Sequence, residues 1–247
     1  MSLNLKGKMT NYPDIKIHNT LPKILRHRSI SMPDTVALRD KDLGIWNEIT
    51  WKQYNNNVSY LALALSKRGF KTGDVIGLIG DNKPSWLYFE LAAQAVGGMS
   101  LGIYRDTLDE EVGYLINAAN VNFVYAEDQE QVDKIQTIKR PKNNKITMFY
   151  EDSRGLKELN DPHIVDMLEL MNEGQAIANK SPNKYNQMID KISTEQDAIL
   201  CTTSGTTSNP KLAMLPGGKF VEHVLRYLNV DPKNVEDEYV SVLPFPW

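Results

Sequence analysis

The feature that most constrains the fold is an alternation of short apolar segments with helical segments between residues 73 and 150. Patterns typical of buried strands occupy residues 73–80, 100–103, 122–126 and 145–150, and helical patterns between them occupy residues 84–97, 107–119 and 129–138. A chain of this kind folds as a mostly parallel sheet with helices on both faces, which places it in the α/β class. Because such sheets bind ligands beyond the carboxyl ends of their strands, we expect a site there.

The flanking segments predict further helices and one hairpin. Before residue 73 we expect a helix over 21–30, a β-hairpin joining 36–39 to 46–49, and a helix opened by a capping box at Thr50 and Gln53. A second capping box, at Thr107 and Glu110, is expected to open the 107–119 helix. After residue 150 the sequence predicts helices over 162–178 and 219–228, a polar surface connection around Pro182, and a strand over 239–243.

Residues 199–215 form an apolar segment, a polar loop and a second apolar segment, and the loop is the first candidate for chemistry. Its hydroxyl, backbone and ammonium donors suit a polyphosphate, and they come from Ser204, Gly205, Thr206, Thr207, Ser208 and Lys211. A Walker A loop is excluded because Pro210 occupies its second glycine position and Leu212 its final hydroxyl position. The other interpretation is a Ser/Thr-rich surface turn that binds nothing, although the Pro–Lys pair and two hydroxyl pairs exceed what a turn requires.

The stretch from Thr203 to Lys211 resembles the phosphate-binding signature of the adenylate-forming enzymes, roughly [ST]-S-G-[ST]-T-G-x-P-K-G. Seven positions match, whereas Ser208 and Leu212 stand where that superfamily usually has glycine. The resemblance implies that Lys211 is catalytic and that the ATP phosphates are bound by Thr203, Ser204, Gly205, Thr206, Thr207 and Ser208. It also implies Mg²⁺ bound mainly through ATP, and the fold of the N-terminal portion of the large domain of these enzymes.

Three other stretches are similar to the first subdomain of long-chain fatty acyl-CoA synthetases. They are residues 73–86, 91–98 and 102–104, which contain Gly-Asp-Asn after one predicted strand and Gly-Ile-Tyr in the next. The similarity implies a fatty carboxylate substrate and CoA as co-substrate. Leu243-Pro244-Phe245 resembles the next motif of the family, which implies Phe245 and Trp247 as walls of the acyl pocket.

The resemblance covers nearly all of this chain but only the first part of the family pattern. We therefore expect a loosely ordered N-terminus over residues 1–20, a first α/β subdomain over 21–180, and the start of a second over 181–247. The segments that hold adenine and ribose and the C-terminal catalytic lysine are absent, so the chain is interpreted as a fragment that is inactive alone. A non-catalytic nucleotide-binding protein and an aryl- or amino-acid-adenylating enzyme stay open as alternatives.

Composition bounds the partners and the compartment. The net charge of -3 gives no electrostatic case for nucleic acid, and no apolar run reaches the ~20 residues of a membrane-spanning helix. A single cysteine, Cys201, excludes an internal disulfide and favours a reducing compartment, so we expect a cytoplasmic protein in which peripheral membrane contact stays open. Cys201 itself is expected to be a small buried side chain. The four histidines lack ligand spacing, so no protein-ligated metal is expected.

Overall fold

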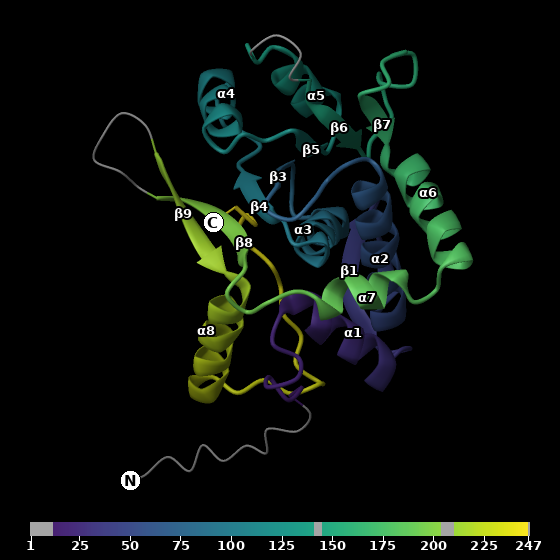
Figure 1. The fold of residues 1–247 in the computed structure, drawn as a ribbon, viewed down its shortest axis with the longest axis vertical. Coiled ribbons are helices and arrows are strands. Elements are labelled where there is room, and N and C mark those ends of the chain that lie inside the picture. The colour runs from purple at the N-terminus through teal and green to yellow at the C-terminus, as the bar shows by residue number, and fades with distance from the viewer. Residues whose placement is uncertain (1–11, 141–144, 204–209, 247) are drawn as a thin grey trace.

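A computed structural model describes residues 12–140, 145–203 and 210–246, which fold as an α/β structure around a seven-stranded sheet (Figure 1). The helices are α1 Leu21–Ser31, α2 Trp51–Lys67, α3 Pro84–Val96, α4 Asp109–Ala118, α5 Gln129–Gln136, α6 Met167–Lys180, α7 Lys184–Asp190 and α8 Gly217–Val230. The sheet strands are β3 Val75–Ile79, β4 Met99–Ile103, β5 Phe123–Ala126, β6 Thr147–Tyr150, β7 Ile164–Asp166, β8 Asp197–Thr203 and β9 Lys211–Pro216. A separate antiparallel hairpin joins β1 Val36–Asp42 to β2 Ile45–Thr50.

The large sheet has the order β7-β6-β5-β3-β4-β8-β9. Every neighbouring pair is parallel except β8 and β9, which form an antiparallel hairpin at one edge. The predicted mostly parallel sheet is therefore confirmed. β8 lies directly beside β4, so the hairpin from the end of the chain extends the sheet built by residues 75–150.

Helices cover both faces of this sheet because consecutive strand residues point to opposite sides. In β3, Ile76 and Leu78 join the buried cluster that includes α2, α3 and α6, whereas Val75 and Ile79 join the cluster that includes α4 and α5. Figure 1 shows α2 and α6 together on one side of the strands, away from α4 and α5. The expected three-layer arrangement is confirmed.

The helix α2 forms where the sequence predicts it. The Thr50 hydroxyl accepts the Gln53 backbone N–H, and the Gln53 side chain in turn accepts the Thr50 N–H, which completes the predicted capping box. Gly69 follows with a φ of +97°, a left-handed conformation that favours glycine. Within the described ranges, no helix is both long and apolar enough to cross a bilayer.

Four local predictions are wrong, each for a physical reason. α4 begins at Asp109 after Leu108, with no side-chain cap, because three acidic residues in its first turn already favour a helix N-terminus. The 162–178 segment begins instead as β7, and α6 starts at Met167, where the Asp166 carboxylate accepts the Leu168 N–H. The connection after Pro182 contains α7. Residues 239–243 form no strand, since no described strand lies beside them to complete a ladder.

Candidate functional site

The β8–β9 hairpin carries the predicted phosphate-binding loop at its tip. Its last residue pair is Thr203 with Lys211, and the Thr203 hydroxyl donates to the Lys211 carbonyl oxygen at 3.4 Å. Both residues are exposed, so a hydroxyl and an ammonium reach solvent side by side. Outside the described residues lie the five predicted contacts between them: Ser204, Gly205, Thr206, Thr207 and Ser208.

The returning strand of the hairpin is attached to α4. The Tyr114 hydroxyl donates to the carbonyl oxygen of Pro210 at 3.1 Å. Pro210 precedes Lys211, so this bond fixes the backbone immediately before the predicted catalytic lysine. No local sequence pattern predicts this contact, because Tyr114 and Pro210 are 96 positions apart.

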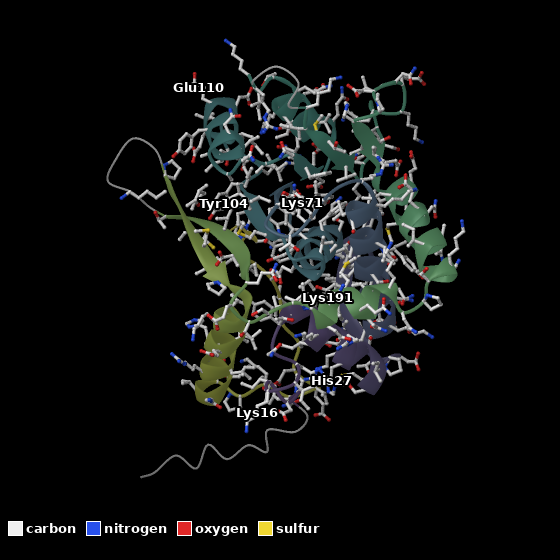
Figure 2. All side chains as sticks on the ribbon, viewed as in Figure 1. Lys16, His27, Lys71, Tyr104, Glu110 and Lys191 are labelled. Atoms are coloured by element: carbon white, nitrogen blue, oxygen red, sulfur yellow. The ribbon has the colours of Figure 1, made fainter. Side chains whose placement is uncertain are left out.

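The hairpin tip lies at the same edge of the sheet as the carboxyl ends of β3 and β4. β4 and β8 are parallel, with Leu101 beside Leu200. Thr203 is three residues beyond Leu200, and Tyr104 is three residues beyond Leu101, so both emerge at this edge. Figure 2 labels Tyr104 near the end of β4. The ligand-binding edge expected for an α/β sheet therefore carries the two described ends of the predicted loop.

A cleft of about 640 Å³ opens at this carboxyl edge. The connection after β3 runs to one face of the sheet and the connection after β4 to the other, which is the arrangement that leaves a crevice between strand ends. The cleft is lined by the turns after both strands and by the end of the chain, through Gly80, Asp81, Asn82, Tyr104, Arg105, Asp106, Thr107, Val242, Pro244 and Pro246.

Ion pairs tie the strand ends around the cleft to one another. Arg105 contacts Asp81 at 2.7 Å and Asp128 at 3.1 Å, joining the segments after β4, β3 and β5. Nearby, Glu127 is almost fully buried and pairs with Lys83 at 3.1 Å. Partial burial lowers the pKa of Lys83, but the neighbouring carboxylates outweigh it and the pKa is raised overall. These charges are neutralised locally, so the group shapes the cleft and offers no unpaired cation to a ligand.

Gly80 is required where β3 ends. A Cβ on Gly80 would lie 2.7 Å from the Cβ of Glu127. The glycine lets Glu127 approach the turn, where its carboxylate accepts the Asp81 backbone N–H at 2.6 Å. Sequence reasoning assigned Gly80 to a strand and identified neither Glu127 nor Arg105, because their partners come from three different strand ends.

The final described segment, residues 241–246, forms one wall of the cleft. The Phe245 ring packs against Trp86, with ring centroids 6.0 Å apart, and Pro246 lies against Gly102. Asn82 hydrogen-bonds to three residues of the segment. Trp247, the second predicted pocket residue, lies outside the described residues. The segment lines the cleft through Val242, Pro244 and Pro246, whereas the predicted pocket residue Phe245 packs on Trp86 and anchors the segment. The structure adds Asn82, whose only signal was the Gly-Asp-Asn resemblance.

Cys201 lies on β8 and is half-buried, which corrects the expectation of a buried side chain. Burial raises the pKa of its thiol, and the Glu90 carboxylate raises it further. A raised pKa lowers the thiolate fraction, so Cys201 is unsuited to act as a nucleophile. In the part of the chain that the structure describes, no three His, Cys, Asp or Glu side chains gather as a metal site.

The hairpin and the cleft fall within a match to a known protein family. The family model described as AMP-binding enzyme matches residues 25–247, which include the hairpin, the cleft and both core clusters. The chain belongs to the AMP-binding enzyme family. The resemblance first noted in the 203–211 stretch is thereby confirmed over nearly the whole chain.

Curated relatives of this AMP-binding enzyme chain include long-chain-fatty-acid–CoA ligases. The chain is 29% identical over 196 residues to the ligase ACSBG2 of Rattus norvegicus, covering 79% of this chain and 29% of that protein. It is 29% identical over 217 residues to ACSBG1 of Homo sapiens, covering 85% of this chain and 29% of the relative. The chain therefore spans about three-tenths of the length of these relatives.

Solved structures share the fold of this AMP-binding enzyme chain at low sequence identity. The crystal structure of VinN superposes with a TM-score of 0.68 and 16% identity, over 91% of this chain and 50% of VinN. A protein titled putative long-chain-fatty-acid CoA ligase, from Rhodopseudomonas palustris, gives a TM-score of 0.66 and 15% identity, over 85% of this chain and 48% of its own. At these identities the likeness establishes the fold alone.

Proposed function

We propose that this chain is the N-terminal part of an AMP-forming fatty acid–CoA ligase. The observation that carries the proposal is the AMP-binding enzyme match over residues 25–247, which includes a hairpin whose tip ends in an exposed hydroxyl and an exposed ammonium. The relatives named long-chain-fatty-acid–CoA ligases support the choice of a fatty carboxylate, with ATP and CoA as the other substrates.

In the proposed reaction, a carboxylate oxygen attacks the α-phosphorus of ATP and pyrophosphate leaves. The sulfur of CoA then attacks the acyl carbonyl, loses its proton, and displaces AMP. The first step builds negative charge on the leaving pyrophosphate, so it is accelerated by preorganised donors and needs no protein nucleophile. A lysine beside a threonine hydroxyl at the hairpin tip supports this role, because both groups donate to phosphate oxygens.

The residues proposed to act in this step have distinct roles. Lys211 stabilises the charge that develops on the phosphates. The hydroxyl and backbone donors of Thr203, Ser204, Gly205, Thr206, Thr207 and Ser208 position them. Phe245 and Trp247 are proposed as walls for the acyl chain.

Magnesium is proposed to bind mainly through ATP. The described donors at the hairpin tip are a hydroxyl and an ammonium, which suit anionic phosphate oxygens, whereas Mg²⁺ favours carboxylate and water ligands. When bound, the ion neutralises phosphate charge. We therefore propose that the hairpin residues contact the phosphates and that ATP itself supplies most ligands of the ion.

The remaining parts of the proposal concern the whole protein. The chain alone is proposed to be inactive, because the segments that hold adenine and ribose in the family are not recognised within it. A cytoplasmic location is proposed from the single cysteine and the substrates, since ATP and CoA are intracellular metabolites.

The test is carboxylate-dependent exchange of labelled pyrophosphate into ATP, measured with short, medium, long and aromatic acids. The product of the complete reading frame is compared with the 247-residue chain. Exchange that peaks with long-chain acids, in the complete product only, is the expected result. A peak with aromatic acids or amino acids would replace the fatty substrate class, and no exchange with any acid would favour a non-catalytic nucleotide-binding role.

A further inference from the structure

One asparagine side chain holds the end of the described chain in place. The amide nitrogen of Asn82 donates to the Leu243 carbonyl oxygen at 2.7 Å and to the Ser241 hydroxyl at 3.2 Å, with a longer contact to the Ser241 carbonyl at 3.4 Å. Its amide oxygen accepts the Phe245 N–H at 2.9 Å. Both ends of the amide are therefore used, and a side chain that offers only acceptors cannot replace it.

The segment has no other polar attachment among the described residues. Residues 239–243 are exposed and pair with no described strand, and in the described ranges every hydrogen bond of residues 239–246 has Asn82 as its partner. Among the described residues, Asn82 therefore supplies the hydrogen bonds that hold this segment in register against the carboxyl end of β3.

Apolar contacts show what this register determines. Phe245 packs against Trp86, which lies in the first turn of α3 and is only 2% exposed. A Cβ on Gly102 of β4 would lie 3.0 Å from Pro246, so the segment runs close over the strand. Val242, Pro244 and Pro246 line the cleft. A shift of the segment would change the width of the cleft between this wall and the turns after β3 and β4.

We propose that Asn82 is a positioning residue for the acid-binding wall. By holding the 241–246 segment, whose Val242, Pro244 and Pro246 line the cleft, it determines how tightly the apolar tail of the carboxylic acid binds. The inference rests on the proposed function. The two substrates are assigned to different parts of the fold. Asn82 acts on the acid through the 241–246 segment, whereas the loop proposed to bind ATP has its described ends on the β8–β9 hairpin.

The test compares Asn82→Ala and Asn82→Asp in the complete reading-frame product, using pyrophosphate exchange. Each variant loses the donors to Ser241 and Leu243, so the KM for a long-chain acid is expected to rise about 10-fold while the KM for ATP stays within about 2-fold. Ser241→Ala removes one acceptor and leaves the backbone contacts, so it should raise the acid KM by about 2-fold. The matched control is Asn117→Ala, because the Asn117 amide donates to the Lys139 carbonyl, away from the cleft.

Amide hydrogen exchange provides a readout that needs no activity. In the 247-residue chain, Asn82→Ala should accelerate exchange of the Phe245 N–H, and Asn117→Ala should not. An unchanged exchange rate of the Phe245 N–H would show that Asn82 does not hold the 241–246 segment in place. The positioning role is overturned if the wild type catalyses pyrophosphate exchange but its Asn82 variants keep the same KM for the acid. It is also overturned if those variants raise the KM for the acid and the KM for ATP equally. Either result leaves the proposed ligase function intact. A wild type without any exchange defeats the proposed function, and with it the role in acid binding.

Discussion

The α2–α3–α6 layer and the β8–β9–α8 limb of the same fold are packed very differently. In the layer, Val58, Leu61 and Phe89 are fully buried against the sheet. In the limb, Met214 is 60% exposed and Val230 76% exposed, although α8 is amphipathic. Figure 1 shows the layer stacked on the strands, whereas the limb projects from one edge of the sheet. The scaffold thus lies in the buried layer, and the residues proposed to bind phosphate belong to the projecting hairpin.

Because the two regions are packed so differently, we expect substitutions to affect stability and activity separately. Residues of the layer contact one another over large buried areas, so their replacement acts on the free energy of unfolding. Residues at the hairpin tip contact few others, so their replacement should leave that free energy nearly unchanged.

The largest expected effect is on catalysis, from Lys211→Ala at the hairpin tip. The variant loses one preorganised donor to the charge that develops on the phosphates. The activation free energy of adenylation should therefore rise by about 2 to 4 kcal/mol, and the rate should fall accordingly. The measurement is pyrophosphate exchange by the complete product, beside urea denaturation. Lys219→Ala is the control, because that exposed lysine pairs with exposed Glu222 on α8 and with no other carboxylate of the described residues. An unchanged exchange rate, or a large loss of stability, would remove Lys211 from its proposed role.

The next effect is on stability, from Gly174→Ala in the layer. A Cβ on Gly174 of α6 would lie 1.8 Å from the Tyr60 carbonyl oxygen on α2, so the two helices must separate. We expect a loss of about 3 kcal/mol in the free energy of unfolding, measured by urea denaturation of this chain.

A matched glycine makes that result specific. Gly113 lies within α4, and a Cβ there would meet only Ile138, at 3.9 Å. Gly113→Ala should therefore stabilise the chain by up to about 1 kcal/mol, because alanine loses less backbone entropy in a helix. If both variants lose stability equally, the close contact between α2 and α6 is not the cause.

Glu90 lies on α3 and gives an effect that depends on pH. Burial raises its pKa to about 7, and a hydrogen bond from Ser100 at 3.4 Å offsets this only in part. The folded chain therefore keeps a proton that the unfolded chain releases near its ordinary pKa of 4.5. Stability is fully present below that value and falls as the pH rises toward 7.

Replacement of Glu90 by glutamine should remove this loss. We expect Glu90→Gln to be about 2 kcal/mol more stable than wild type at pH 8, and nearly equal to it at pH 4.5. Urea denaturation at both pH values is the measurement. An identical difference at the two pH values would show that the carboxyl group does not titrate as inferred.

The layer was predictable from sequence, and much of the cleft was not. Local signals sufficed for α2, where Thr50 and Gln53 cap the helix and buried residues recur at helical spacing. β7 was missed because three residues are too few to establish a period of two. Residues 239–243, which lead into the wall of the cleft, were predicted as a strand because their apolar residues fit one.

Contacts between distant segments explain the remaining gap. The Thr203–Lys211 motif was readable because its residues are adjacent along the chain. Asn82 bonds to a segment 159 to 163 positions away, and Arg105 pairs with carboxylates from two other strand ends. No local pattern encodes such pairs, since they form only when the sheet order brings the strand ends together.

The smallest expected effect tests the one described bond between α4 and the hairpin tip. Tyr114→Phe removes the hydroxyl that donates to the Pro210 carbonyl and keeps the ring, so the free energy of unfolding should fall by only about 1 kcal/mol. Because Pro210 precedes Lys211, the KM for ATP should rise while the acid KM stays constant. Tyr227→Phe on α8 is the control, since among the described residues its hydroxyl bonds to exposed Asp231 alone. A constant KM for ATP would show that the hairpin itself holds its tip in place. In that case the bond from Tyr114 to Pro210 would contribute to stability and not to ATP binding.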